Sequence, residues 1–303
     1  MTLTKEQLEV RLSMITGSDA GAIEGTSPYT SCYQAWARKT RRVVDTFAGN
    51  NKTELGTWLE AFAVKKYEEH SGKKCRKSIR TLRHKRYPFI GGHIDRLVEG
   101  DPNRGVECKA VTSDGMGKWF DEDDELMVPA YYVSQVKHYA LVTGRMIWDF
   151  AVVFTDGRRD PFFTTIEFSQ ADLDQYLERC IAFWKHVDSD SPPDVDGLDA
   201  TAATLKQEWR ESDPGMVKVA SKEVMQYLKE RSGHKAMREA YEAHIQLLEN
   251  RLRNFLQEAD TIVAPTGEVL CTWKQTKKGD RRFNFNYRRE NNYGEKRNAA
   301  EIN

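Results

Sequence analysis

The segment that most restricts the fold is Val106-Glu-Cys-Lys-Ala110, in which apolar and charged residues alternate. Successive side chains of a β-strand point to opposite faces. Glu107 and Lys109 would therefore share one face, with Val106 and Cys108 turned towards a core. The pattern predicts a half-buried strand over residues 105–111.

A second strand is expected immediately before it, over residues 89–98, and it carries a single acidic residue, Asp95. The connecting stretch, Asp101-Pro-Asn-Arg-Gly105, has the composition of a turn. A hairpin of these two strands would bring Asp95 beside Glu107 and Lys109.

Strands and helices interleave along the first 187 residues, which predicts an α/β core, a mixed sheet flanked by helices. Further strands are expected over 75–83, 146–154 and 162–168, and helices over 53–70, 128–143 and 169–187. The stretch DSDSPPDVDGLDA (188–200) has linker composition. Residues 201–303 are expected to form a C-terminal appendage, a charged helix over 219–259 followed by a β-hairpin.

The composition argues against several classes of protein. The 303 residues carry 46 basic and 46 acidic side chains, so a protein that coats nucleic acid indiscriminately is disfavoured, although basic clusters leave room for a local groove. The five cysteines are scattered without a Cys-x-x-Cys pair, which argues against a disulfide framework or a structural zinc site. Neither a long apolar run nor a secretory signal occurs, so we expect no transmembrane helix and a cytoplasmic location.

The hairpin residues suggest metal-assisted chemistry. The carboxylates Asp95 and Glu107 would form a hard-oxygen site suited to Mg²⁺, or to Mn²⁺. Lys109 on the same face could orient or deprotonate a water if desolvation lowers its pKa. Metal-activated water attacking a phosphodiester is the reaction that this set serves best. The alternative is a surface ion pair between adjacent strands.

Glu60 is a candidate from the helix expected over 53–70. It lies among apolar neighbours, one turn after Gly56, which would permit close approach of another backbone segment. A buried carboxylate needs a partner, and a metal-bound water would provide one. The alternative is a solvated helix position.

Gln135 and Tyr139 share one face of the helix expected over 128–143, at i and i+4. Their amide and phenol groups could hold a phosphate or a base near the scissile bond. The alternative is an amphipathic packing stripe.

Arg11 and Ser18 form a possible anion site near the N-terminus. Ser18 is expected to cap a helix that ends near Gly25, and its hydroxyl, with the first backbone N–H groups, could bind an anion together with Arg11. Any capping serine has this appearance, so the feature is weak by itself.

Taken in order, the motifs Gly-x-x-x-Glu, Asp, Glu-x-Lys and Gln-x-x-x-Tyr resemble the RecB-like branch of the PD-(D/E)XK nucleases. The stretch ITGSDAGAIEGTSPYTSCYQAW and the Arg11–Ser18 spacing resemble the YqaJ-type viral recombinases and the lambda exonuclease family. The likeness spans roughly residues 8–187 and implies a restriction-endonuclease-like fold. One departure is His93, which stands where the family has a small residue and is taken as structural.

The resemblance implies a role for each candidate residue. Asp95 and Glu107 would be metal ligands and Lys109 the catalytic lysine. Glu60 and Gln135 would assist at the catalytic site. The terminal 5′-phosphate and the DNA would be bound by Arg11, Ser18 and Tyr139.

The same resemblance implies a Mg²⁺-dependent exonuclease of phage or prophage recombination, which degrades one strand of linear double-stranded DNA from a 5′ end and leaves a 3′ single strand. It further implies a homotrimer and a single-strand annealing protein as partner. No phosphate-binding loop of the Gly-x4-Gly-Lys type occurs, so no ATP use is expected. The alternatives are an endonuclease of the same fold and a non-catalytic DNA-binding subunit of recombination.

The end of the appendage interleaves basic and aromatic residues in WKQTKKGDRRFNF (273–285). Such a segment can follow a phosphate backbone and stack on bases. The alternative is a hairpin that packs on its own domain and leaves its lysines in solvent.

Overall fold

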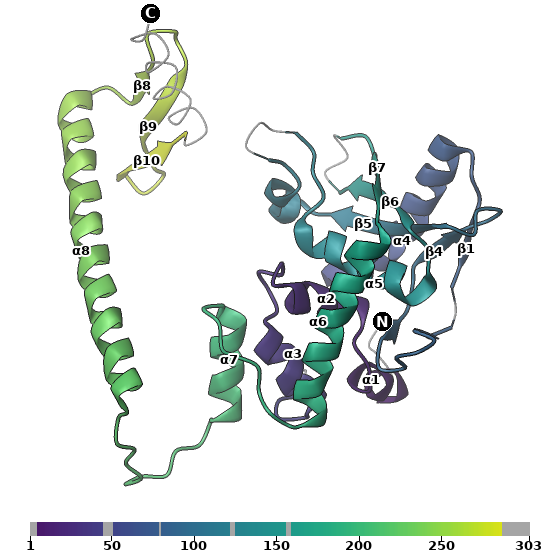
Figure 1. Cartoon of the computed structure of the whole chain (residues 1–303). Helices are drawn as coiled ribbons and strands as arrows, with labels where there is room; N and C mark the ends of the chain where they lie inside the picture. The colour runs from purple at the N-terminus through teal and green to yellow at the C-terminus, as the bar shows by residue number, and fades with distance from the viewer. Residues whose placement is uncertain (1–4, 45–50, 79, 122–124, 156–158, 287–303) are drawn as a thin grey trace, which may run out of the picture. The chain divides into compact units, whose positions relative to one another are not determined.

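The strand expected around Glu107 is β5 (Arg104–Val111), the middle strand of a five-stranded sheet with the order β1-β4-β5-β6-β7. In the computed structural model, which describes residues 5–44, 51–78, 80–121, 125–155 and 159–286, the strands β5 and β6 are parallel and the other neighbours are antiparallel (Figure 1). The remaining strands of this sheet are β1 (Cys75–Lys77), β4 (Arg96–Val98), β6 (Ile147–Phe154) and β7 (Phe162–Glu167). The mixed sheet predicted from the sequence is confirmed.

The chain forms two compact units, Met1–Ser212 and Asp213–Asn303. The helices of the first unit are α1 (Lys5–Leu12), α2 (Gly17–Glu24), α3 (Cys32–Lys39), α4 (Asn51–Ser71), the 3₁₀ helix η1 (Ser113–Lys118), α5 (Ala130–Thr143), α6 (Gln170–Asp188) and α7 (Asp199–Glu208). None of the described helices of the chain is long and apolar enough to span a bilayer.

The neighbouring strand β6 reads Ile-Trp-Asp-Phe-Ala-Val-Val-Phe, and seven of its eight residues are buried. A nearly continuous apolar run is typical of a strand that is covered on both faces. Parallel strands need a crossover between them, and α5 provides it between β5 and β6. The crossover places α5 over the face of the sheet to which Glu107 and Lys109 point.

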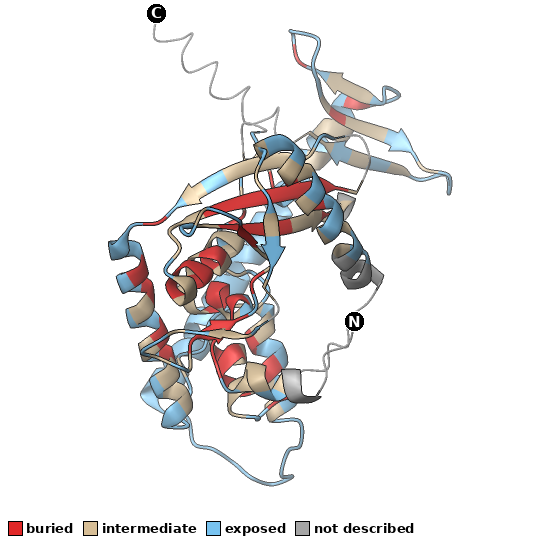
Figure 2. Ribbon diagram, turned by 90° about the vertical axis from the view of Figure 1, so that its right-hand side faces the viewer, coloured by how far each residue is buried: buried red, intermediate tan, exposed pale blue. Residues whose placement is uncertain are grey.

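The two faces of the sheet have separate cores, and buried residues lie both on the strands of the sheet and on helices (Figure 2). On one face, Ala63 and Tyr67 of α4 pack on Val106 and Cys108 of β5. On the other face, alternate residues of β6, such as Trp148, join a larger core built with α2, α3, α5 and α6. Because Glu107 and Lys109 alternate with Val106 and Cys108, they point into the second layer and not towards α4.

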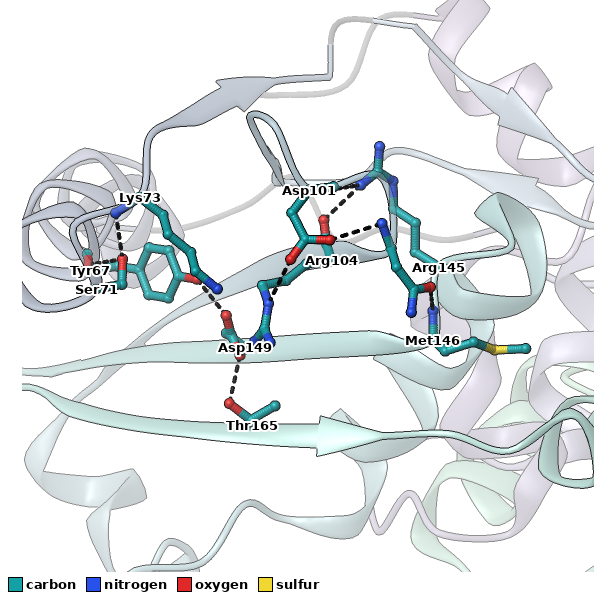
Figure 3. Close-up of polar contacts among 10 residues, drawn as sticks. Tyr67, Ser71, Lys73, Asp101, Arg104, Arg145, Met146, Asp149 and Thr165 are labelled. Carbon is teal, nitrogen blue, oxygen red and sulfur yellow. Dashed lines mark hydrogen bonds and ion pairs between the residues drawn. The ribbon is translucent and has the colours of Figure 1, made fainter.

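A buried aspartate fixes α4 on the sheet (Figure 3). Asp149 of β6 accepts hydrogen bonds from Arg104 Nη1 and Thr165 Oγ1, each at 2.7 Å, and from the Tyr67 hydroxyl of α4. Burial, followed by the bond to Asp149, raises the pKa of Tyr67 well above its usual value. A buried charge needs such partners, so this network joins α4, β5, β6 and β7.

The strands expected over 75–83 and 89–98 are each broken in two. Residues 82–83 form β2 (Leu82–Arg83), which pairs with β3 (Gly91–Gly92) in a separate two-stranded sheet. A Cβ at Gly91 would lie 2.4 Å from the Leu82 carbonyl oxygen, so this close approach requires glycine. Buried His138 of α5 contacts the same strand, since its Nε2 lies 2.9 Å from the Gly91 backbone oxygen.

The environment of His138 disfavours its charged form. Its ring is fully buried, and its Nδ1 lies 3.0 Å from the Tyr176 hydroxyl. Burial is the main reason why the pKa of His138 falls to about 4. The neutral ring thus ties α5 to β3 and to α6.

The linker expected at 188–200 leads into α7, which lies in the first unit. Glu208 at the end of α7 accepts from the Tyr33 hydroxyl at 2.7 Å and from Arg42 at 3.2 Å. These contacts of Glu208 attach α7 to α3 and to Arg42, which follows α3. The expected domain boundary at 188–200 stays a prediction.

The second unit contains the long helix α8 (Lys222–Leu256) and a three-stranded antiparallel sheet. Its strands are β8 (Thr261–Val263), β9 (Val269–Gln275) and β10 (Arg281–Phe285). Leu256, Ala264 and Cys271 are its buried apolar residues among those described. The helix and hairpin predicted for the appendage are confirmed.

Candidate active site

Asp95 directly precedes β4, which runs antiparallel to β5 with Arg96 opposite Val106. The Cys108 backbone N–H donates to Asp95 Oδ2 at 3.3 Å. The expected hairpin geometry is confirmed, because the Asp95 carboxylate lies against β5 between the positions of Glu107 and Lys109.

Glu107, Lys109 and Gln135 form one hydrogen-bonded cluster. Lys109 Nζ lies 2.5 Å from Glu107 Oε1 and 3.0 Å from Gln135 Oε1. The Gln135 amide Nε2 donates to Glu107 Oε1 at 2.8 Å and to the Tyr139 hydroxyl at 2.7 Å. The helix pair expected at i and i+4 therefore reaches the two β5 residues directly.

The pKa values in this cluster depend on burial and on the other carboxylate. Burial and the nearby charge of Asp95 raise the pKa of Glu107 to about 8. Burial would lower the pKa of Lys109, but Glu107 and Asp95 outweigh it and raise that pKa. The lowered lysine pKa considered from the sequence depends on nearby cations and stays a prediction, whereas the protein groups that surround Lys109 are anions.

The cluster fits a divalent cation. Glu107 is 1% exposed, and its Oε2 is buried without a hydrogen-bond partner in the part of the chain described. An unpaired buried carboxylate oxygen beside a second carboxylate is costly, and a cation would compensate both. No group of three or more His, Cys, Asp or Glu side chains suited to a metal occurs among the described residues. Mg²⁺ is compatible with this set, since it often binds one or two carboxylates and keeps several waters.

A cavity of about 280 Å³ connects this cluster with the predicted anion site. Its walls include Asp95, Gln135 and Tyr139 from the cluster, and Arg11 and Ser18 from the N-terminal segment. Arg11 Nη2 donates to Ser18 Oγ at 2.9 Å. The structure thus brings together residues that are more than 120 positions apart in the sequence.

Ser18 is not the capping residue that the sequence suggested. The N-cap of α2 is Thr16, whose N–H donates to Asp19 Oδ2 at 2.8 Å. Asp19 also pairs with Lys39 Nζ at 2.7 Å, and this pairing holds the first turn of α2 on α3. Ser18 therefore sits inside the first turn, where its hydroxyl is available to Arg11 and to Thr16 Oγ1 at 2.9 Å.

Tyr139 packs under the start of α2. A Cβ at Gly17 would lie 2.6 Å from the Tyr139 ring, so only glycine allows this approach. Burial raises the pKa of Tyr139 well above its usual value, so its hydroxyl stays protonated. Gly17 was not singled out from the sequence, although its place beside a predicted helix start was a usable signal.

Glu60 lies in α4 and forms an ion pair with Arg96 Nη1 at 2.5 Å. The same guanidinium donates to the Asp95 backbone oxygen at 2.7 Å. Glu60 does not line the cavity described above, and its metal-supporting role stays a prediction. Its connection to Asp95 runs through the Arg96 side chain. The suggested reason for Gly56 is wrong, because a Cβ there would meet no atom within 4 Å.

His93, which the sequence comparison treated as structural, is exposed and lines the cavity. Its Nε2 lies 3.1 Å from Thr81 Oγ1, and Thr81 is another wall residue. Both were missed as site residues. The position of His93, two residues before Asp95, was the available signal.

Comparisons with known proteins agree with this architecture. Residues 6–146 match the family described as the YqaJ-like viral recombinase domain. The uncharacterized protein YqaJ of Bacillus subtilis (strain 168) is 29% identical over 279 residues, which cover 89% of this chain and 82% of that protein.

Among solved structures, the chain is similar to LHK-Exo, an alkaline exonuclease from Laribacter hongkongensis. The crystal structure of LHK-Exo with dAMP has a TM-score of 0.50 and 21% identity, and the match covers 62% of this chain and 94% of that chain. At this identity the likeness concerns the fold, and it agrees with the restriction-endonuclease-like sheet expected from the sequence. The predicted resemblance is confirmed: the chain is similar to the YqaJ-like viral recombinase domain over residues 6–146 and to YqaJ itself over most of its length.

Proposed function

We propose that this chain is a Mg²⁺-dependent exonuclease that degrades one strand of linear double-stranded DNA in the 5′-to-3′ direction and leaves a 3′ single-stranded overhang. The observation that carries the proposal is the single cavity shared by the Arg11–Ser18 pair and by Asp95, Gln135 and Tyr139. A terminal phosphate held by Arg11 and Ser18 would place the adjoining phosphodiester beside the carboxylates.

Each side chain has a distinct task in this proposal. Arg11 and Ser18 bind the terminal phosphate through charge-assisted hydrogen bonds. Asp95 and Glu107 would hold Mg²⁺, or Mn²⁺, which when bound polarises a phosphoryl oxygen and lowers the pKa of the attacking water.

Lys109, whose Nζ lies 2.5 Å from Glu107 Oε1, orients the water or stabilises the developing negative charge. Gln135 holds the Lys109 ammonium and the Glu107 carboxylate in place, and its amide also bonds the Tyr139 hydroxyl. Tyr139 forms the floor next to the bound DNA end.

We further propose that the catalytic part lies within residues 1–187 and acts in recombination of a phage or prophage in the cytoplasm of a bacterial host. A homotrimer and a single-strand annealing partner complete this proposal. Both rest on the resemblance to the lambda exonuclease family. Sedimentation analysis of the full chain, with a trimer as the expected species, tests the first.

The test of the activity uses linear duplexes labelled at either the 5′ or the 3′ end, with and without a 5′-phosphate, and with and without Mg²⁺. We expect stepwise release of nucleotides from 5′ ends only when Mg²⁺ is present. A closed circular duplex should remain intact. Cleavage of the circle would assign the protein to the endonucleases, and binding without cleavage in Mg²⁺ would make it a non-catalytic subunit.

A further inference from the structure

The hairpin of β9 and β10 in the second unit has an aromatic face that is used for packing. Trp273 and Phe283 are cross-strand partners whose rings stack at 5.5 Å, and Phe283 stacks on Phe285 at 5.1 Å. Arg253 of α8 lies 4.9 Å above the Phe283 ring. Rings that are stacked on each other and covered by an arginine are not free to stack on bases, so this part of the sequence-based expectation is not supported by the contacts.

Arg281 belongs to the same packed structure. Its guanidinium lies 3.7 Å from the Trp273 ring, and it donates to the backbone oxygens of Trp273 at 3.0 Å and of Gln257 at 2.7 Å. A third bond goes to the Ala259 oxygen. Arg281 therefore ties the hairpin to the end of α8 and has little capacity left for a ligand.

Four other cations of the hairpin have no such task. Lys274 and Arg282 are exposed and stand directly opposite each other on β9 and β10. Lys277 and Lys278 are exposed in the turn that joins the two strands. We call these four residues the hairpin cation cluster. None of them forms an ion pair with a carboxylate of the described residues, whereas Lys235, Arg238 and Arg253 of the same unit pair with glutamates of α8.

This arrangement costs stability unless an anion compensates it. Like charges that stand directly opposite on adjacent strands repel each other. The chain as a whole has as many acidic as basic residues, so a cluster without carboxylate partners among the described residues does not follow from an average excess of lysine and arginine. The neighbouring pair on the same face, Thr272 and Asn284, is uncharged and can donate further hydrogen bonds.

We propose that the hairpin cation cluster is a second DNA-binding surface, which contacts the phosphate backbone and does not read bases. The proposal extends the proposed function, because it assigns a DNA contact to the unit that lacks the nuclease motifs. Lysine and arginine without exposed aromatic neighbours on the same face bind phosphates in a sequence-independent, salt-sensitive manner.

The test measures binding of the full chain in EDTA, so that cleavage plays no part. The probes are a fluorescent duplex whose two ends are closed by hairpin loops, which removes the terminal 5′-phosphate, and a single strand of the same length. The variant Lys274→Gln/Arg282→Gln removes the cross-strand cations. The matched control, Lys218→Gln/Lys229→Gln, removes two exposed lysines of the same unit that form no ion pair with a described residue.

If both cations contact phosphates, the plot of log K for binding against log salt concentration should be less steep for Lys274→Gln/Arg282→Gln than for wild type. The difference in slope should be about 1.8 for the duplex or about 1.4 for the single strand, and the control should keep the wild-type slope. The probe that shows the loss identifies which form of DNA the cluster holds. The exchange variant Lys274→Arg/Arg282→Lys, which keeps both positive charges, should keep the wild-type slope. An unchanged slope, or an equal loss in the control, would overturn the proposal.

The two proposals fail separately in this design. Binding to closed-end DNA in EDTA needs neither a metal nor a terminal phosphate, so it is independent of the nuclease assignment. Conversely, a chain that cleaves linear DNA with wild-type polarity but shows no slope change in the hairpin variant would retain its nuclease assignment and lose this surface.

Discussion

Replacement of Arg11 by glutamine should remove the preference for phosphorylated 5′ ends. The Arg11 guanidinium contacts the Ser18 hydroxyl at 2.9 Å on the wall of the cavity that holds Asp95. A hydrogen bond to a charged group contributes roughly 1.5–3 kcal/mol, which corresponds to about 10–150-fold in kcat/KM at ~1.4 kcal/mol per tenfold. Arg11 is half-buried and open to the cavity, so we expect the lower part of this range, about tenfold.

The assay compares kcat/KM on two duplexes of identical sequence that differ only in the terminal 5′-phosphate. Wild type should prefer the phosphorylated duplex, and Arg11→Gln should slow only that substrate. The control is Arg41→Gln, because Arg41 is exposed and pairs with Glu9 in the same N-terminal region. Exposed pairs of this kind contribute little, so the preference should persist. Equal wild-type rates on both ends, or an Arg11→Gln loss that is equal on both, would refute the reasoning.

Three further outcomes follow from contacts of the first unit. Glu107→Gln should lower the cleavage rate on the order of a thousandfold. Mg²⁺ should raise the melting temperature of wild type but not of this variant. Near-wild-type cleavage by the variant would show that Glu107 is not part of the catalytic site. Gly17→Ala should destabilise the protein by about 1–3 kcal/mol in urea unfolding, because its Cβ would lie 2.6 Å from the Tyr139 ring, whereas Gly56→Ala, the control in open space, should be neutral or stabilising. The pKa of His138 is about 4 in the folded protein and ordinarily 6.5, so the unfolded chain binds the proton first as the pH falls. The free energy of unfolding should therefore decrease by up to about 3 kcal/mol between pH 6.5 and pH 4. Urea titrations over this range should give a steeper dependence of the unfolding free energy on pH for wild type than for His138→Gln, and parallel curves would contradict the assignment.

The sheet and the carboxylate hairpin were predictable because they depend on local patterns. Alternation in β5 and a turn sequence before it were sufficient to place Asp95 beside Glu107. The helix pair Gln135 and Tyr139 was predictable in the same way, from i, i+4 spacing. In each case the relevant residues lie within one element or one hairpin.

The features that were missed depend on partners that are distant in the sequence. Arg96 as the partner of Glu60 requires α4 and β4 to be placed in space first. The break in the strand expected over 75–83 depends on the close approach of Gly91, which no local propensity reports. The direction in which the pKa of Lys109 shifts depends on which charges surround it after folding, and among the protein groups these are the carboxylates of Glu107 and Asp95.

The docking of α2 on α5 determines when the cavity can form during synthesis. Gly17 packs on Tyr139, and Glu24 pairs with Lys137 at 2.8 Å, so α2 finds its partner only after about 120 further residues have been made. At roughly 5–20 residues per second, this delay lasts about 6–24 seconds. A ribosome-bound chain that ends before α5 contains the Arg11–Ser18 pair and both carboxylates but has no wall to join them. With the proposed nuclease activity, an incomplete chain that ends before α5 should therefore leave the DNA of the cell that makes it uncut.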